Sequence, residues 1–212
     1  MYEFLDAREQ EFRKIVAHLS LPDFVSALPY QLLGNAYHNS HHLRSVAINA
    51  YHIAKSEGCE NDIAMIAFLA GISHDMGYIN PAHEAANIIV AQRHFSTLCQ
   101  QLYILHPLEE VGQAMIRNTI NDGKPKDFTA GKSDDWIVYD SDLSVWFNIE
   151  QDEMQYLLEG LSKEMNITAT VESTKDFLSH AGFGTITGQK KLEEFLQSDI
   201  ELPSVDFMLG IA

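Results

Sequence analysis

The chain has 212 residues, about the length of one domain, and its 46% apolar and 21% charged residues exclude collagen-like, low-complexity and largely disordered proteins. Its formal net charge is −16 at pH 7, which argues against general binding to nucleic-acid duplexes or to anionic membranes. Residues 134–212 carry 16 of the 30 acidic and 4 of the 14 basic side chains, a pattern typical of a solvated helical surface.

Helical periodicity dominates the first third of the chain. Apolar residues from 4 to 19 predict an amphipathic opening helix, and residues 22–29, bounded by two prolines, predict a connector. Residues 43–54 place their apolar side chains on one helix face that ends near Gly58. Residues 63–72 are apolar nearly all round, which indicates a helix in the middle of the core.

The remaining elements are also predicted to be helical. Prolines at 81 and 107 stand at the favoured start of a helix, and residues 121–126 form the clearest loop. No sustained strand alternation and no internal repeat is present, so an all-α single-domain bundle is predicted. Helices are expected over 82–95, 108–120, 134–147 and 152–165, and one or two shorter helices over 170–200, with glycines between them at 182, 184 and 188.

The sequence shows no disulfide, secretory or membrane-spanning pattern, and this predicts the cellular location. Cys59 and Cys99 stand in neither a CxxC nor a CxH arrangement, which favours free thiols in a reducing cytoplasm. The first residues are charged and contain no secretory apolar region, and the longest apolar stretch, 63–72, is far short of a membrane span. A cytoplasmic protein without membrane contact is expected, and its oligomeric state is left open.

Histidine and aspartate spacing gives the strongest chemical signal. His38 and His42 stand four residues apart and would share a helix face. His74 and Asp75 close the most apolar helix, where burial is costly unless a partner such as a divalent metal satisfies both side chains. The segment 140–142 adds two aspartates to an otherwise apolar helix.

These residues, in this order, resemble the HD superfamily of metal-dependent phosphohydrolases. The resemblance lies in YHNSHH at 37–42 with Val46 four positions on, HD at 74–75 and YDSDLS at 139–144, and it covers about residues 37–145. The YHNxxHxxxV form is similar to the signature of cyclic-nucleotide phosphodiesterases and of short bacterial HD proteins. Further residues are similar to the acidic helix that often follows in the short bacterial group: Glu153, Tyr156 and Glu164.

The resemblance implies that His42, His74, Asp75 and Asp142 bind one divalent ion. Such mixed nitrogen and oxygen ligands favour Mn²⁺, Fe²⁺, Co²⁺, Ni²⁺ or Zn²⁺, with Mg²⁺ possible. Asp140 is the rival for the last position, because two residues separated by two positions on a helix cannot face one ion equally. The DLS match favours Asp142.

The resemblance also implies catalytic roles. His38 would protonate the leaving oxygen, and Asp75 would orient the attacking water as well as bind the ion. Asn39 would either help to bind the substrate or cap a helix. Structural alternatives remain open: residues 74–75 could be a hydrogen-bonded pair at a helix end, and His38 could be a supporting or surface residue. His41 points elsewhere on the same helix and is expected to be exposed.

The chain departs from the family pattern in phosphate binding. HDMGY at 74–78 lacks the lysine that follows HD in many of these enzymes, so Arg117 and Lys124 are considered as substitutes among the basic residues. In two-metal members, further histidines bind a second ion. Residues 83–84 (His83 and Glu84) and His106 could do so, but as residues at helix starts they are interpreted as caps or as lining of the substrate pocket, and one metal is expected.

The functional prediction is a metal-dependent phosphohydrolase acting on a phosphate ester or anhydride. The resemblance favours a small-molecule substrate, in particular a nucleotide. The alternatives are a cyclic-nucleotide or oligonucleotide phosphodiesterase and, outside enzymes, a nucleotide-binding HD sensor or scaffold. One HD-type domain is expected over residues 1–212, with its motif core at 37–145 and an acidic helical C-terminal extension at 150–212.

Overall fold

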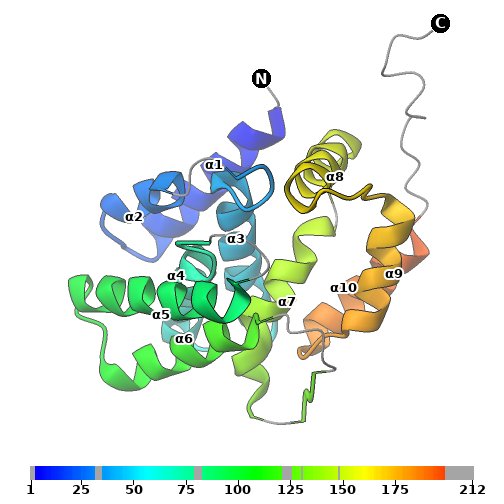
Figure 1. Ribbon diagram of the computed structural model, residues 1–212. Helices are drawn as coiled ribbons and strands as arrows, with labels where there is room; N and C mark the ends of the chain where they lie inside the picture. The colour runs from blue at the N-terminus through cyan, green and yellow to red at the C-terminus, as the bar shows by residue number, and fades with distance from the viewer. Residues whose placement is uncertain are drawn as a thin grey trace, which may run out of the picture.

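The computed structural model describes residues 3–31, 35–78, 83–120, 126–129, 131–147 and 149–198. Every regular element within these ranges is a helix, which confirms the all-α prediction (Figure 1). No helix among the described residues combines the length and apolar character needed to cross a membrane. The longer helices are α1 (Glu3–His18), α3 (Ser40–Ser56), α4 (Asn61–Ser73), α5 (Glu84–Gln101), α6 (His106–Asn118), α7 (Ile137–Leu143), α8 (Gln151–Met165), α9 (Val171–Ala181) and α10 (Ile186–Gln197).

Two segments differ from the sequence prediction. The connector at 22–29 contains a short helix, α2 (Phe24–Ala27), followed by the 3₁₀ turn η1 (Leu28–Gln31). The single helix expected over 134–147 is divided into η3 (Ser133–Trp136), α7 and η4 (Ser144–Trp146). The hydroxyl of Ser144 donates 2.5 Å to the Asp140 carbonyl four residues earlier, a contact that competes with the helical ladder and accompanies its change of pitch.

The centre of the molecule is formed by α3 and α4, as the apolar pattern at 63–72 predicts. The α4 side chains from Ile66 to Ile72 are fully buried. Gly71 allows α4 to approach α3 closely, because a Cβ atom there would lie 2.9 Å from Cα of Ala47. This close crossing brings the N-terminal turn of α3 and the C-terminal end of α4 together.

The C-terminal helices lie on the other side of α3 and α7 from α5 and α6 (Figure 1). The side chain of Asp140, on α7, forms hydrogen bonds with the residues that begin α10. Its carboxylate accepts hydrogen bonds from the backbone amides of Gly184 (2.9 Å) and Thr185 (2.7 Å) and from the Thr185 hydroxyl (2.6 Å). The segment 170–200, predicted to form one or two shorter helices, forms two, and Gly188 lies inside α10 and not between them.

Candidate metal centre and adjoining cavity

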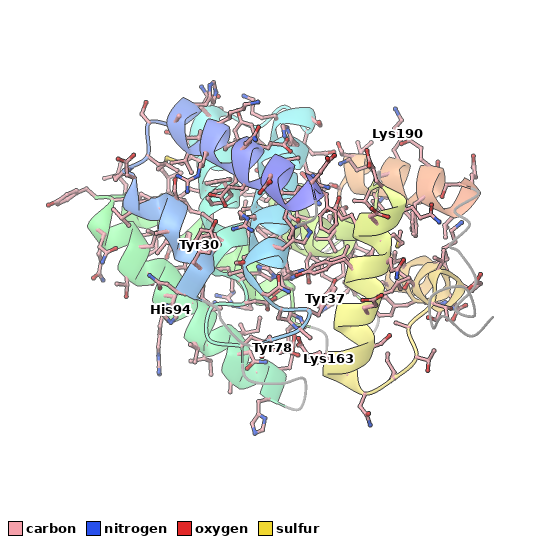
Figure 2. The ribbon with its side chains drawn as sticks, turned by 90° about the horizontal axis from the view of Figure 1, so that it is seen from above. Tyr30, Tyr37, Tyr78, His94, Lys163 and Lys190 are labelled. Atoms are coloured by element: carbon pink, nitrogen blue, oxygen red, sulfur yellow. The ribbon has the colours of Figure 1, made fainter. Side chains whose placement is uncertain are left out.

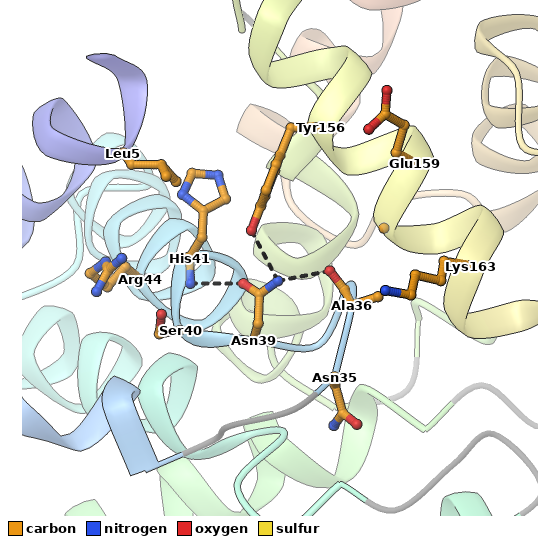
Figure 3. A pocket seen from close by; sticks show the side chains of 11 residues that line it. Leu5, Asn35, Ala36, Asn39, Ser40, His41, Arg44, Tyr156, Glu159 and Lys163 are labelled. Atoms are coloured by element: carbon orange, nitrogen blue, oxygen red, sulfur yellow. Dashed lines mark hydrogen bonds between the residues drawn. The ribbon is translucent and has the colours of Figure 1, made fainter. Parts of the chain in front are cut away.

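The first turn of α3 is shaped by Asn39. Its side-chain oxygen accepts hydrogen bonds from the backbone amides of His41 (2.9 Å) and His42 (3.2 Å), as expected for a helix N-cap. Its amide nitrogen donates to the Ala36 carbonyl (2.9 Å) and contacts the Tyr156 hydroxyl (3.3 Å) (Figure 3). Because both ends of the amide are engaged within the chain, Asn39 acts as a helix cap.

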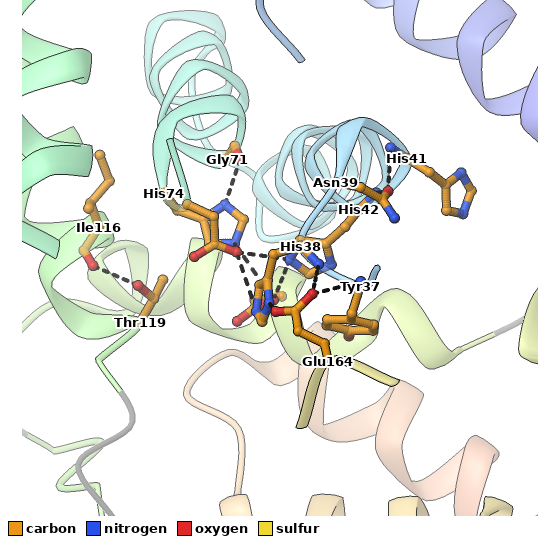
Figure 4. Close-up of polar contacts among 12 residues, drawn as sticks. Tyr37, His38, Asn39, His41, His42, Gly71, His74, Ile116, Thr119 and Glu164 are labelled. Atoms are coloured by element: carbon orange, nitrogen blue, oxygen red, sulfur yellow. Dashed lines mark hydrogen bonds and ion pairs between the residues drawn. The ribbon is translucent and has the colours of Figure 1, made fainter. Parts of the chain in front are cut away.

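The end of α4 presents His74 and Asp75 toward α3. His74 Nδ1 lies 2.8 Å from the Gly71 carbonyl, which fixes the orientation of the ring (Figure 4). Gly77 then takes a φ of +87°, a left-handed conformation that favours glycine, and the chain turns away from the helix axis. Local geometry therefore aims both side chains at the interface between α3 and α4.

Four side chains from three separate helical regions meet at this interface. His42 Nε2 lies 3.1 Å from Asp75 Oδ2 and 3.2 Å from Asp142 Oδ1. His74 Nε2 lies 2.9 Å from Asp75 Oδ2 and 3.7 Å from Asp142 Oδ1. An ion about 2.0–2.2 Å from each ligand atom holds neighbouring ligand atoms about 2.9–3.5 Å apart. Three of the four spacings match that range, so the residues present fit one small divalent ion.

The hydrogen bond from His74 to Gly71 supports this fit. A carbonyl oxygen only accepts, so His74 Nδ1 carries a proton, and the neutral ring then has a lone pair on Nε2. This buried Nε2 makes no hydrogen bond, yet it lies 2.9 Å from Asp75 Oδ2. Two acceptors at that distance repel each other unless a cation or a further proton lies between them.

Electrostatics at this cluster are those of a cation site. Burial opposes ionisation of Asp75 and Asp142, but the neighbouring imidazoles outweigh burial and hold the pKa of each carboxyl below its usual range. Burial likewise opposes protonation of His42 and His74, and the two carboxylates still raise the pKa of both rings. Protons and a divalent ion therefore compete for the same side chains.

His38 lies at the edge of the cluster and is held by Glu164 of α8. Its Nε2 is 3.8 Å from Asp75 Oδ2, while its Nδ1 forms a short contact with Glu164 Oε1 (Figure 4). Glu164 also accepts from the backbone amides of Tyr37 (2.8 Å) and His38 (3.1 Å). Burial raises the pKa of Glu164, but these hydrogen bonds outweigh it and the net shift is downward. The Tyr78 ring stacks on His38 at 3.8 Å between centroids.

His38, His42 and Asp75 also lie close enough to form a second possible ligand triad, so His38 could contact an ion directly. From the sequence, Glu164 was identified only as part of an acidic helix, without a role at the site. The signal that could have identified it is weak, because the contact joins residues 126 positions apart.

A cavity of about 390 Å³ adjoins the cluster, near the small end of the roughly 300–1,000 Å³ typical of small-molecule sites. Tyr37 and Tyr78, two of its aromatic residues, lie beside α8 in Figure 2. Its polar part is formed by His38, Asp75, Glu84, Asp142, Thr119, Ser173 and Thr174. The apolar lining residues, here called the apolar wall, are Leu143, Trp146, Leu161, Met165, Ile167 and Phe177.

Several residues expected at the substrate lie elsewhere. Glu84 lines the cavity, whereas its neighbour His83 is exposed before the first turn of α5 and is not among the lining residues. His106 is also exposed and pairs with Glu110 at 3.7 Å. Arg117 is exposed on α6 and does not line the cavity, because the buried face of that helix is formed by its apolar residues. Lys124 lies outside the described residues.

Asp140 and Asp142 point in different directions, as their two-residue spacing requires. Asp142 faces the histidines, whereas Asp140 is fully buried against the start of α10. Burial raises the pKa of Asp140 to about 6, despite the hydrogen bonds that it accepts there. The structure thus brings Asp142, and not Asp140, to the candidate metal centre.

The expectation that His41 is exposed is wrong. The residue is 2% exposed, and its Nε2 lies 3.1 Å from Glu153 Oε1, which also accepts from Arg8 Nε at 3.1 Å. The Phe4 and Tyr156 rings pack against its imidazole in edge-to-face and near-perpendicular contacts. The error arose because helices α1 and α8 cover this face of α3, which the local pattern around His41 does not reveal.

No protein-family model, curated protein or solved structure matches this chain. The resemblance to HD phosphohydrolases therefore rests on the motif residues of the sequence.

Proposed function

We propose that this protein is an HD-type, metal-dependent phosphohydrolase. The observation that carries the proposal is the convergence of His42, His74, Asp75 and Asp142 at spacings compatible with one ion, beside a cavity that His38 also lines. Two imidazoles and two carboxylates form a borderline donor set, suited to Mn²⁺, Fe²⁺, Co²⁺, Ni²⁺ or Zn²⁺ and also able to take Mg²⁺.

The proposed mechanism assigns each side chain a separate task. A divalent ion bound there supplies Lewis-acid polarisation of the phosphoryl group and lowers the pKa of a bound water. Asp75 offers a carboxylate oxygen that can orient the attacking water. His38 donates a proton from Nε2 to the departing alcohol or phosphate oxygen. Glu164 supports this step by positioning the ring, because its Oε1 contacts Nδ1 and leaves Nε2 on the side of Asp75.

The proposal is tested with purified protein that has been stripped with EDTA and reloaded with each of these metals. Metal content is measured by elemental analysis, and phosphate release is followed over a panel of nucleotide esters, anhydrides and diesters. We expect metal-dependent hydrolysis that EDTA abolishes. His74→Ala and Asp75→Ala should lose bound metal and turnover together.

His52→Ala is the matched control, because His52 lies on α3, is half exposed and pairs with Glu11 at 2.9 Å away from the cluster. It should keep both metal and rate. His38→Ala should keep metal but lose rate, most strongly for substrates with poor leaving groups. Protein that takes up none of the metals, or turnover that survives complete metal removal, would contradict the proposal. Metal and nucleotide binding without turnover would instead favour a sensor.

A further inference from the structure

The cavity beside the candidate metal centre has two chemically different kinds of lining residue. Its lining combines the carboxylates of Asp75, Asp142 and Glu84 and the imidazole of His38 with the apolar residues of the wall defined above. We propose, resting on the hydrolase function above, that the site takes nucleoside monophosphates and discriminates against di- and triphosphates. One phosphate binds at the metal centre, and the aromatic base packs on the apolar wall.

The expected discrimination against di- and triphosphates follows from the charge of the cavity lining. Among the described residues that line the cavity there is no lysine or arginine, whereas three are acidic. Each additional phosphate of a polyphosphate brings further negative charge that proteins normally balance with Lys, Arg or metal ions. Two carboxylates, those of Asp75 and Asp142, would already offset the charge of one divalent ion bound at the candidate centre. A chain of phosphates in the cavity would therefore meet three acidic side chains and no lysine or arginine among the described lining residues.

The expected binding of an aromatic base follows from the apolar wall. Phe177 is 46% exposed and Ile167 is 54% exposed, so both offer apolar surface to a ligand in the cavity that they line. Trp146, another lining residue, stacks on Tyr37 with an interplanar angle of 13°. Flat aromatic groups gain most from such surfaces, since they bury large apolar area with few rotatable bonds. Ser173 and Thr174 add hydroxyl groups to the cavity lining.

The reaction balances with water as the only co-reactant. The water oxygen forms a new bond to phosphorus while the bond from phosphorus to the 5′ oxygen of the nucleoside breaks. That oxygen leaves with a proton from His38 as the nucleoside alcohol, and the proton lost by the water restores the imidazole through solvent. The products are a nucleoside and inorganic phosphate.

The test compares kcat/KM of the metal-loaded full chain for AMP, ADP, ATP and ribose 5-phosphate. We expect AMP to exceed ATP by at least about tenfold, because like charges are brought together in the polyphosphate complex. AMP should exceed ribose 5-phosphate by a similar factor of about ten, mainly through KM, because the sugar phosphate has no base to bury. Glu84→Lys should reduce the preference for AMP over ATP.

Phe177→Ala isolates the apolar wall. It should raise KM for AMP more than KM for ribose 5-phosphate, and it should weaken adenosine binding measured by calorimetry, which requires no turnover. Phe24→Ala is the matched control, because Phe24 is similarly exposed (41%) but lies on α2 outside this cavity. It should change neither quantity.

Each half of the inference can fail separately. Metal-dependent hydrolysis that prefers ADP or ATP would overturn the charge argument and leave the proposed function intact. Equal kcat/KM for AMP and ribose 5-phosphate would overturn the argument from the apolar wall. No hydrolysis of any phosphate by metal-loaded protein would remove the proposed function and this inference with it.

Discussion

The crossing of α3 and α4 at Gly71 gives a sharp prediction that does not depend on the substrate. In Gly71→Ala, the new Cβ atom would lie 2.9 Å from Cα and 3.2 Å from the backbone nitrogen of Ala47. It would also lie 3.3 Å from the Val46 carbonyl oxygen. All three neighbours are backbone atoms of a buried helix, so no side chain can rotate to make room. The two helices must therefore move apart.

The magnitude follows from two opposing effects. Overpacking of a core costs about 1–3 kcal/mol, whereas replacing glycine by alanine inside a helix gains about 1 kcal/mol. Because all three neighbours are backbone atoms, the overpacking cost should lie at the upper end of that range, which leaves a net loss of roughly 2 kcal/mol in the free energy of unfolding, or a fall in Tm of about 4–8 °C. Because His74 lies three residues beyond Gly71, the same displacement should weaken divalent-metal affinity by about tenfold or more.

The assay separates stability from site geometry. Unfolding is measured by denaturant titration in EDTA, and metal affinity is measured by calorimetry on the folded protein. Gly58→Ala is the control, because its Cβ atom meets nothing within 4 Å but its φ of +79° is strained for alanine, which costs about 1–2 kcal/mol. It should lose comparable stability and keep its metal affinity. A Gly71→Ala protein as stable as the natural chain, or equal loss of affinity in both variants, would refute the reasoning.

Three further predictions address neighbouring side chains. Asp142→Asn should abolish metal binding, whereas Asp140→Asn should retain the metal. Asp140→Asn should instead lose about 1–3 kcal/mol of stability, because a buried amide cannot accept all the bonds that the carboxylate accepts. Elemental analysis measures the metal and denaturation measures the stability of each variant, and the reverse pattern would show that Asp140 is the ligand. Glu164→Gln should lower kcat by about 10–100-fold with unchanged metal content, Glu164→Asp should restore part of the rate, and an unchanged kcat would rule out a positioning role. Burial and the nearby carboxylate of Asp134 raise the pKa of Cys59 to about 11. In a Cys99→Ser background, the rate of Cys59 alkylation by iodoacetamide should therefore keep rising up to about pH 11, whereas in the urea-unfolded chain this rate should level off about two pH units lower. Identical rate profiles in the two states would contradict the raised pKa.

The parts of the fold that were predictable are those whose signal is local. The apolar residues of 63–72 indicated a buried helix, and α4 is buried along that stretch. The prediction that His38 and His42 share a helix face is wrong, because α3 begins at Ser40 and His38 precedes its N-cap residue. Both side chains nevertheless approach Asp75. Their partners Asp75 and Asp142 could be grouped with them only through the family resemblance, because periodicity does not place distant helices together. The structure then brings all four onto one region.

The parts that failed depend on contacts between distant segments. His41 was expected to be exposed because its neighbour His42 faces the interior, yet α1 and α8 cover it from the other side. Arg117 was considered for phosphate contact because it is cationic, yet the face of α6 that carries it points to solvent. In both cases the residue type was informative and its orientation was not, because orientation is set by which helices pack on each side.

The C-terminal extension at 150–212 contributes residues to the candidate site, although it lies outside the motif core. Its first helix, α8, contacts the segment leading into α3 at several points. Glu164 holds Tyr37 and His38, and Gly160 lies so close to Ala36 that a Cβ atom there would be 2.7 Å from the Ala36 carbonyl oxygen. Met165 and the α9 residue Phe177 complete the apolar wall of the cavity. The candidate metal ligands all lie within the motif core, but the orientation of His38 and the shape of the cavity are set by the extension. The four candidate ligands, spread over residues 42–142, therefore do not by themselves define the site, because residues of the following helices hold His38 and line part of the cavity.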